Sequence, residues 1–288
     1  MKTYLDCLPC MMSQALRAGR MATNDEVKIK KLLDNVGAMM KDIRLESIPP
    51  ETGDAIYKEV SKITGVADPY KKVKESNIQE ALSLYPELKE IIRKSDNKLL
   101  TAIRIAIAGN VIDLGVDKEF NIVEDVKEIL QQEFGIFDFE EFKEHLEKAN
   151  KILYIGDNAG ESVFDKILIE ELGKPATYVV RDIPVINDVT FQDAVDSGID
   201  EVAEIISSGS SAPAVILELC NENFLEKFSV SDMVISKGQG NYEGLSNVDR
   251  SLFFLLKAKC HVIANDLNVK ENDIILKGIN LLNREKNE

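Results

Sequence analysis

The sequence has little positive charge, few histidines and no long apolar run. Its 288 residues include 35 Lys and Arg against 50 Asp and Glu, and the formal net charge is −15. Such a surface repels phosphate backbones and anionic lipid, so we expect neither a nucleic-acid nor a membrane-surface partner. No apolar stretch approaches the about 20 residues of a membrane span, and the N-terminus does not read as a signal peptide. With two histidines, His145 and His261, a histidine-based site is not expected, and His261 is interpreted as a core residue.

Cysteine is also scarce. Four Cys without a secretory signal predict reduced thiols and a cytoplasmic protein. Cys7 and Cys10 have C-x-x-C spacing, but no predicted strand precedes them as in thioredoxin-like redox sites. Cys220 and Cys260 do not form the second C-x-x-C pair that structural zinc would require. On a helix Cys7 and Cys10 share one face, so a place in the core and a metal or redox role both stay open.

The hydrophobic content of 44% is enough for one large domain or two smaller ones, and the pattern changes near residue 148. Residues 1–148 form a predicted helical region, with helices in 27–43, 49–64, 99–112 and 141–151. In 149–288, short apolar runs alternate with helical patterns. We expect strands at 152–155, 177–180, 202–206, 233–236, 261–264 and 274–276, and helices at 162–172, 191–196 and 214–220. This alternation predicts an α/β fold with a mainly parallel sheet covered by helices.

Polar, mostly glycine-bearing turns follow four of the predicted strands, at the edge where open α/β sheets bind ligands. The turns are 156–161, 181–190, 207–213 and 237–242. Asp157, Asn158 and Asp188 offer hard oxygen ligands that suit Mg²⁺ or Mn²⁺. A Gly/Ser loop that opens a helix would offer N–H donors to an anion, and Lys237 would offer a point charge. Together these features indicate phosphoryl chemistry, in which positioning and charge stabilisation do most of the work.

Each feature also has an ordinary structural interpretation. Asp157 and Asn158 before a helix are more often a cap than ligands, and Asp188 could cap the next helix. The Ser-rich loop could be a helix start, and Lys237 could be solvated. The sequence has no G-x-x-x-x-G-K-[ST], and no G-x-G-x-x-G at the first strand–helix turn, which argues against a P-loop NTPase and a standard dinucleotide site.

Seven short motifs in one order resemble the metal-dependent damage-control phosphatases, a family first catalogued as domain of unknown function 89. They are CLPC (7–10), GNVID (109–113), GDNAGE (156–161), PVINDVT (184–190), SGSSAP (208–213), KGQGNYEGL (237–245) and KC (259–260). The CLPC start resembles the cysteine-bearing archaeal and bacterial subgroup. The resemblance implies a helical N-terminal region on a three-layer, Rossmann-like α/β domain. It also implies hydrolysis of phosphate monoesters with a divalent ion such as Mn²⁺, Mg²⁺, Co²⁺ or Ni²⁺.

The same resemblance assigns roles to residues of this chain. The family's metal ligands correspond to Asp157, Asn158 and Asp188, and its phosphate-side lysine corresponds to Lys237. Catalysis would therefore rest on Asp157, Asp188 and Lys237. The substrate- or phosphate-binding residues would be Asn110, Asp113, Gly160, Glu161, Gly209, Ser210, Ser211, Lys237, Gly238 and Asn241, with Cys7 and Cys10 as further candidates. Asn110 could instead cap a helix beside Gly109.

One departure from the family pattern bears on specificity. Other members carry an Asp after the Lys-Gly pair, where this chain has Gln239, so the sugar-phosphate branch is not assured. The main hypothesis is a metal-dependent phosphatase acting on small phosphorylated metabolites, damaged ones included, such as sugar phosphates or nucleotides. The alternatives are a non-catalytic module that binds a nucleotide or phosphosugar, and a nucleotide-dependent transferase.

Overall fold

The structure is a computed structural model that describes residues 1–109 and 122–281. Within them one seven-stranded sheet has the order β1-β7-β6-β5-β2-β3-β4. Every neighbouring pair is parallel except β6 with β7. The strands are β1 (Phe134–Phe137), β2 (Ile152–Ile155), β3 (Ala176–Val180), β4 (Glu204–Ser207), β5 (Met233–Lys237), β6 (Leu252–Lys257) and β7 (Ile274–Ile279). The mainly parallel α/β fold is thereby confirmed.

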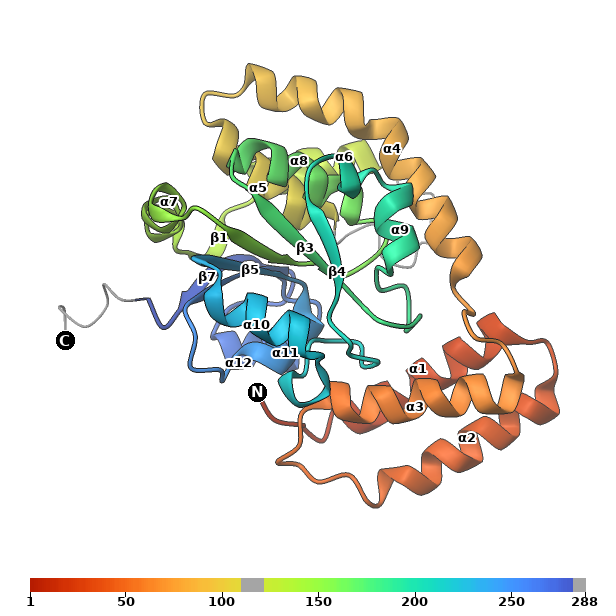
Figure 1. Ribbon diagram of the computed structural model, residues 1–288. Coiled ribbons are helices and arrows are strands. Elements are labelled where there is room, and N and C mark those ends of the chain that lie inside the picture. Colours follow the sequence, from red (N-terminus) through yellow and green to blue (C-terminus); the bar gives the residue numbers. More distant parts are fainter. Residues whose placement is uncertain (110–121, 282–288) are drawn as a thin grey trace.

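Helices cover both faces of the sheet and make three layers (Figure 1). One face carries α4 (Lys71–Lys94), α5 (Lys98–Ala108), α6 (Ile122–Gln131), α7 (Phe139–Lys148), α8 (Ser162–Leu172) and α9 (Phe191–Asp196). The other carries α10 (Glu222–Val230), α11 (Gln239–Leu245) and α12 (His261–Leu267). Strand β2 lies between β3 and β5, and its apolar side chains alternate between the two cores. Ile152 and Tyr154 enter one core, and Leu153 and Ile155 enter the other.

Three helices form a separate unit, drawn in red and orange in Figure 1. They are α1 (Cys7–Ala22), α2 (Glu26–Met40) and α3 (Pro49–Thr64). Helix α3 begins at Pro49 and ends before Gly65, whose φ of 77° suits glycine. Its residue Gly53 has no room for a side chain, because a Cβ atom would lie 2.7 Å from the ring of Pro213. The unit therefore packs closely on a loop of the α/β layers.

The helical region that was predicted for residues 1–148 is not a single unit apart from the sheet. Helices α4 to α6 and strand β1 precede that position, and yet they belong to the layers of the sheet. Tyr85 of α4 donates to Glu170 of α8 at 2.6 Å, and Arg104 of α5 donates to the carbonyl oxygen of Ile129 in α6 at 2.8 Å. The part that stands apart is thus the α1–α3 unit.

Two predicted elements are wrong. Residues 261–264 form the start of helix α12 rather than a strand, because a four-residue apolar run has no periodicity that separates the two. His261 is accordingly exposed rather than in the core, with Nε2 3.3 Å from Asp6 Oδ1. The predicted helix at 214–220 is replaced by a 3₁₀ turn at Leu217–Leu219 before α10. Strands β1 and β6 were not predicted.

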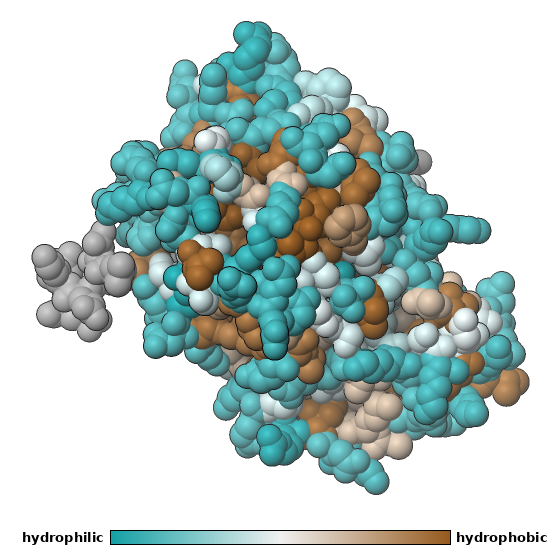
Figure 2. Space-filling view, viewed as in Figure 1, coloured by the Kyte–Doolittle hydropathy of each residue, from teal (hydrophilic) through white to brown (hydrophobic). Residues whose placement is uncertain are grey.

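The surface agrees with the composition. On the face shown in Figure 2, hydrophilic side chains predominate and apolar side chains gather in separate groups among them. Among the helices of the described residues, none has the length and apolar character to span a bilayer.

Candidate active site

The turns after β2 and β3 are joined through their backbones. Asn158 and Asp188 form an antiparallel bridge. The Val189 amide donates to the Asp157 carbonyl at 2.8 Å, and the Ala159 amide donates to the Asn187 carbonyl at 2.8 Å. Two segments 30 residues apart in the chain therefore lie side by side at one edge of the sheet, as expected for neighbouring parallel strands.

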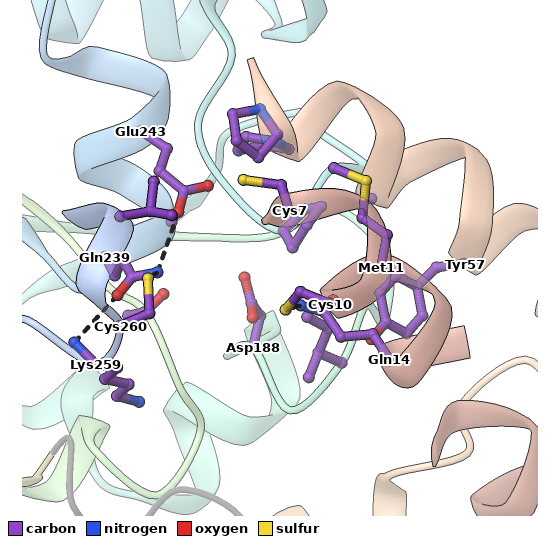
Figure 3. A pocket seen from close by; sticks show the side chains of 18 of the residues that line it. Cys7, Cys10, Met11, Gln14, Tyr57, Asp188, Gln239, Glu243, Lys259 and Cys260 are labelled. Atoms are coloured by element: carbon purple, nitrogen blue, oxygen red, sulfur yellow. Dashed lines mark hydrogen bonds between the residues drawn. The ribbon is translucent and has the colours of Figure 1, made fainter. Parts of the chain in front are cut away.

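This edge opens into a cavity of about 360 Å³ between the α/β layers and the α1–α3 unit (Figure 3). The sheet edge contributes Asp157, Asn158, Asn187 and Asp188. A second wall comes from α1 and α3, namely Cys7, Cys10, Met11, Gln14, Arg17, Pro49, Pro50, Gly53 and Tyr57. The starts of α11 and α12 form the third, with Gln239, Gly240, Glu243, Lys259, Cys260, His261 and Val262. The predicted ligand residues thus share one cavity.

The three candidate ligands do not cap the helices that follow them. The N-cap of α8 is Glu161, without a side-chain capping bond. The N-cap of α9 is Thr190, which forms a capping box with Asp193. Because other residues hold these positions, the capping interpretation of Asp157, Asn158 and Asp188 is set aside.

A buried arginine holds the two aspartates. Arg181 is 1% exposed, and its Nε donates to Asp188 Oδ2 at 2.7 Å. Its Nη2 lies 3.9 Å from Asp157 Oδ1 and donates to Asn241 Oδ1 at 2.9 Å. Burial raises the pKa of Asp157 well above its usual range, and the carboxylates of Glu161 and Asp188 raise that pKa further, while Arg181 opposes the shift. Negative charge at this turn is therefore under-compensated.

Behind the first turn lies a second buried cation. Lys237 is fully buried, and its Nζ lies 2.8 Å from Glu161 Oε2 and 2.8 Å from Asp165 Oδ1. Burial works to lower the pKa of Lys237, but the two carboxylates outweigh it and raise the pKa. Glu161 Oε1 in turn accepts from Asn158 Nδ2 at 2.6 Å. The predicted phosphate-side lysine thus lies outside the lining of this cavity.

The charge and chemistry of this cluster fit a divalent cation. Its members are four carboxylates and two buried cations: Asp157, Glu161, Asp165, Asp188, Arg181 and Lys237. The negative excess and the oxygen donors suit a hard ion such as Mg²⁺ or Mn²⁺. Within residues 1–109 and 122–281 no set of three His, Cys, Asp or Glu side chains is arranged as a metal site. A cation here would therefore need Asn158, with water or substrate oxygens completing its shell.

Two predicted binding residues support the site from outside the cavity lining. Gly238 has a φ of 79°, and a Cβ atom there would lie 1.9 Å from Asp157 Oδ2. Only glycine therefore leaves room for the Asp157 carboxylate. Asn241 is fully buried, and its Nδ2 donates to the carbonyls of Gly156 at 3.0 Å and Lys237 at 2.8 Å. Both residues hold the turns in place.

The predicted anion cradle at the Gly/Ser loop is not formed as expected. No helix starts at Ser211 in the described chain, since residues 208–216 are irregular. Ser210 Oγ donates to the Ala214 carbonyl at 2.9 Å, and Ser211 Oγ donates to Asp54 Oδ1 at 2.7 Å. These two hydroxyls brace the loop and its contact with α3. The loop residues Gly209, Ser210 and Ser211, like Gly160, do not line the cavity, and Asn110 and Asp113 lie outside the described residues.

Both cysteines of the C-x-x-C pair line the cavity, and Cys7 also packs against two hydrophobic cores. Cys260 lines the cavity as well, and all three are free thiols (Figure 3). Burial raises the pKa of Cys7, which favours its protonated form. Glu243, in the same part of the cavity, has its pKa raised by burial to about 7.

Three residues of the site were not predicted from the sequence, namely Arg181, Glu243 and Lys259. Arg181 opens the turn after β3, but a lone arginine there gives no sign of its burial. Glu243 lies within the KGQGNYEGL motif. Lys259 belongs to the KC motif and lines the cavity. Burial raises the pKa of Asp157 and of Glu161, and the positive charge of Lys259 opposes both shifts. The KC motif was the available signal for Lys259.

Comparisons with known proteins identify the family to which this chain belongs. Residues 3–275 match the family model of the damage-control phosphatase ARMT1-like domain. A damage-control phosphatase of Pyrococcus horikoshii is 35% identical over 282 residues, which cover 96% of this chain and 97% of the relative. One from Archaeoglobus fulgidus is 31% identical, covering 94% and 97%. A crystal structure of a DUF89 family protein from P. horikoshii superposes with a TM-score of 0.88 at 34% identity, covering 96% of this chain and 98% of that one. The chain therefore belongs to the damage-control phosphatase ARMT1-like family.

Proposed function

We propose that the protein is a metal-dependent phosphoric monoester hydrolase that acts on small phosphorylated metabolites, including damaged sugar phosphates or nucleotides. Asp157, Asn158 and Asp188 would hold one divalent ion, with Mn²⁺, Mg²⁺, Co²⁺ and Ni²⁺ as the candidates. The observation that carries the proposal is the joining of the two turns, which brings these oxygen donors to one cavity of negative excess. A cytoplasmic location is part of the proposal.

The cavity suits a small substrate. Its volume of about 360 Å³ is at the lower end of the range for small-molecule sites, about 300–1,000 Å³. The helices α1 and α3 form the wall of the cavity opposite the sheet edge. The negative net charge favours neither a polyanion nor a membrane as partner.

The residues of the cavity would divide the work. A bound cation would polarise a phosphoryl oxygen and offset the charge that develops in the transition state. Asp157 and Asp188 would hold that cation, and Arg181 keeps Asp188 in place through its 2.7 Å contact. Lys259 would contact the phosphate, since among the described lysines it is the one that lines the cavity.

Phosphate release from an aryl phosphate tests the proposal. The chelated protein should be inactive, and each of the four ions should be added back separately. We expect ion-dependent release of free phosphate without any acceptor, and its loss in Asp157→Asn. A non-catalytic binding module would bind phosphosugars or nucleotides without releasing phosphate. A transferase would require a nucleotide or an acceptor. A screen of sugar phosphates and nucleotides with the best ion then defines the substrate class.

A further inference from the structure

Lys237, Asp165 and Glu161 form a buried ion cluster behind the cavity. Asp165 is fully buried, and its two oxygens accept from Tyr154 Oη at 2.7 Å and from Tyr178 Oη at 2.9 Å. The Lys237 ammonium adds a third contact at 2.8 Å. Strands β2, β3 and β5 and helix α8 are thereby tied to one carboxylate, which fixes where the Lys237 ammonium lies.

From this anchor a chain of contacts runs toward the cavity. The same ammonium lies 2.8 Å from Glu161 Oε2, and Glu161 Oε1 accepts from Asn158 Nδ2 at 2.6 Å. Glu161 is 1% exposed, so water does not compete for these contacts. Asn158 is the last residue in this series of contacts, and it lines the cavity.

The contact decides which atom of the Asn158 amide is available to a ligand. A carboxylate paired with an ammonium accepts hydrogen bonds and cannot donate them. The amide nitrogen of Asn158 must therefore face Glu161, and the oxygen is the amide atom left for a cation. The orientation of an amide is set by its hydrogen-bond partners in this way. Rotation by 180° would place two oxygens against each other and present N–H groups to the cation.

We propose that Lys237 is a positioning residue for the metal ligand Asn158, acting through Glu161, and not a phosphate-binding group. The inference rests on the proposed function, because it takes the divalent ion to bind at Asn158. It also gives the two turns matching supports, since buried Arg181 contacts Asp188 as buried Lys237 contacts Glu161. Partners of this kind fix the orientation of metal ligands in proteins.

Direct measurement of Mn²⁺ binding tests the inference without relying on activity. The full-length protein is stripped of metal and titrated with Mn²⁺, and free Mn²⁺ is read by electron paramagnetic resonance. In Lys237→Met we expect Mn²⁺ affinity to fall about 10- to 100-fold, as for loss of other outer partners of a ligand. At saturating Mn²⁺, inhibition of aryl phosphate hydrolysis by inorganic phosphate should be unchanged in this variant.

The chain offers a matched control. Lys74 is 2% exposed and lies 2.7 Å from Asp193 Oδ2 and 2.9 Å from Asp68 Oδ2, outside the cavity lining. Lys74→Met removes a buried ammonium from two carboxylates in the same way, so it should lower stability but leave Mn²⁺ affinity unchanged. If Lys237→Met does not fold, Glu161→Gln replaces it. This variant keeps the shape but lets an N–H group face the Asn158 amide, and it should weaken Mn²⁺ in the same direction.

The outcomes separate the two proposals. Parental Mn²⁺ affinity in Lys237→Met, or in Glu161→Gln where that variant is needed, overturns the positioning role alone. So does an equal loss of affinity in Lys74→Met, which would make the effect one of general stability. Weaker inhibition by phosphate in Lys237→Met at saturating Mn²⁺ would show that Lys237 binds the phosphate. A parent protein that binds none of the four candidate ions, Mn²⁺, Mg²⁺, Co²⁺ and Ni²⁺, contradicts the proposed function, and the inference falls with it.

Discussion

The two main walls of the cavity differ in how their side chains are held. On the sheet side, the candidate ligands are 8% exposed or less and are supported by the buried cations Arg181 and Lys237. On the helical side, α1 presents Cys10 and Arg17, which are exposed. The sheet wall thus holds its charged side chains in buried ion pairs, whereas the helical wall presents exposed polar side chains such as Arg17.

This difference indicates a division of function between the walls. Preorganised charge is what phosphoryl transfer requires, so the proposed function assigns the chemistry to the sheet edge. The α1–α3 unit has its own core and meets the sheet edge across the cavity, so it is placed to select the substrate. Changes on the sheet wall should therefore affect turnover or ion binding, and changes on the helical wall should affect preference among substrates.

The largest effects are expected at the two aspartates. Asp157→Asn and Asp188→Asn should each lower phosphatase activity by more than the about 100- to 1,000-fold typical of losing one donor to the transition state. Their stabilities should diverge. Without metal, Asp157→Asn should unfold at the parental temperature or higher, because it relieves repulsion from Glu161 and Asp188.

Asp188→Asn should instead be destabilised, because it removes the negative charge that lies 2.7 Å from the buried Arg181. Removing one member of a buried pair typically costs about 3–5 kcal/mol. Thermal unfolding of the chelated proteins measures the difference. Equal stability in the two variants would contradict the assignment of Arg181 to Asp188, and parental activity in both would contradict the site.

The next largest effect is expected at Lys259. Lys259→Met should lower turnover about 100- to 1,000-fold, the usual cost of losing one donor to the transition state. Inorganic phosphate should also inhibit it much less than the parent. The control is Lys270→Met, since Lys270 is exposed and does not line the cavity. Steady-state kinetics with added phosphate decide the point, and unchanged phosphate inhibition in Lys259→Met would move the anion site elsewhere.

A smaller effect is expected in the pH dependence of stability. Burial raises the pKa of Glu243 to about 7 from the ordinary 4.5, so the folded protein keeps this proton where the unfolded chain has lost it. This group therefore makes the free energy of unfolding fall as pH rises from about 4.5 to about 7. Glu243→Gln should reduce that fall and be more stable than the parent above pH 7. Chemical denaturation of chelated protein at several pH values tests it, and identical pH slopes would refute it.

The smallest effect on the chemistry is expected from the helical wall. A Cys7→Ser, Cys10→Ser double variant should fold and keep metal-dependent hydrolysis, since the oxygen donors of the sheet wall suffice for the ion. Its relative rates on different substrates should change more than its Mn²⁺ affinity. If the double variant fails to bind Mn²⁺, the thiols are ligands and the division between the walls is wrong.

Much of the fold could be predicted because its signals are local. Strand β2 and helix α8 follow from an apolar run, a glycine turn and a helical period, and both were predicted with their observed bounds. The errors fall where an apolar run is short. Residues 252–256 and 262–264 are both apolar, and only their tertiary surroundings make the first part of a strand and the second part of a helix.

The site was harder to predict, because the burial of a side chain depends on residues that are distant in the sequence. The sequence places Asp157 and Asp188 at strand ends, and the parallel sheet brings them together. The sequence does not reveal that the Lys237 ammonium contacts the carboxylates of Glu161 and Asp165. Nor does it reveal that Lys259 lines the cavity, whereas Lys237 does not. Both lysines lie at or just after the end of an apolar strand. Lys237 is held away from the cavity by carboxylates at the start of α8, and the sequence gives no local sign of these contacts.

The most direct test of the site is a crystal of the protein soaked in Mn²⁺ and measured at the manganese absorption edge. The proposed site predicts one anomalous peak in contact with oxygens of Asp157, Asn158 and Asp188, with the Asn158 amide nitrogen still bonded to Glu161. A peak among Cys7, Cys10 and Cys260, or none beside Asp157 and Asp188, would contradict it.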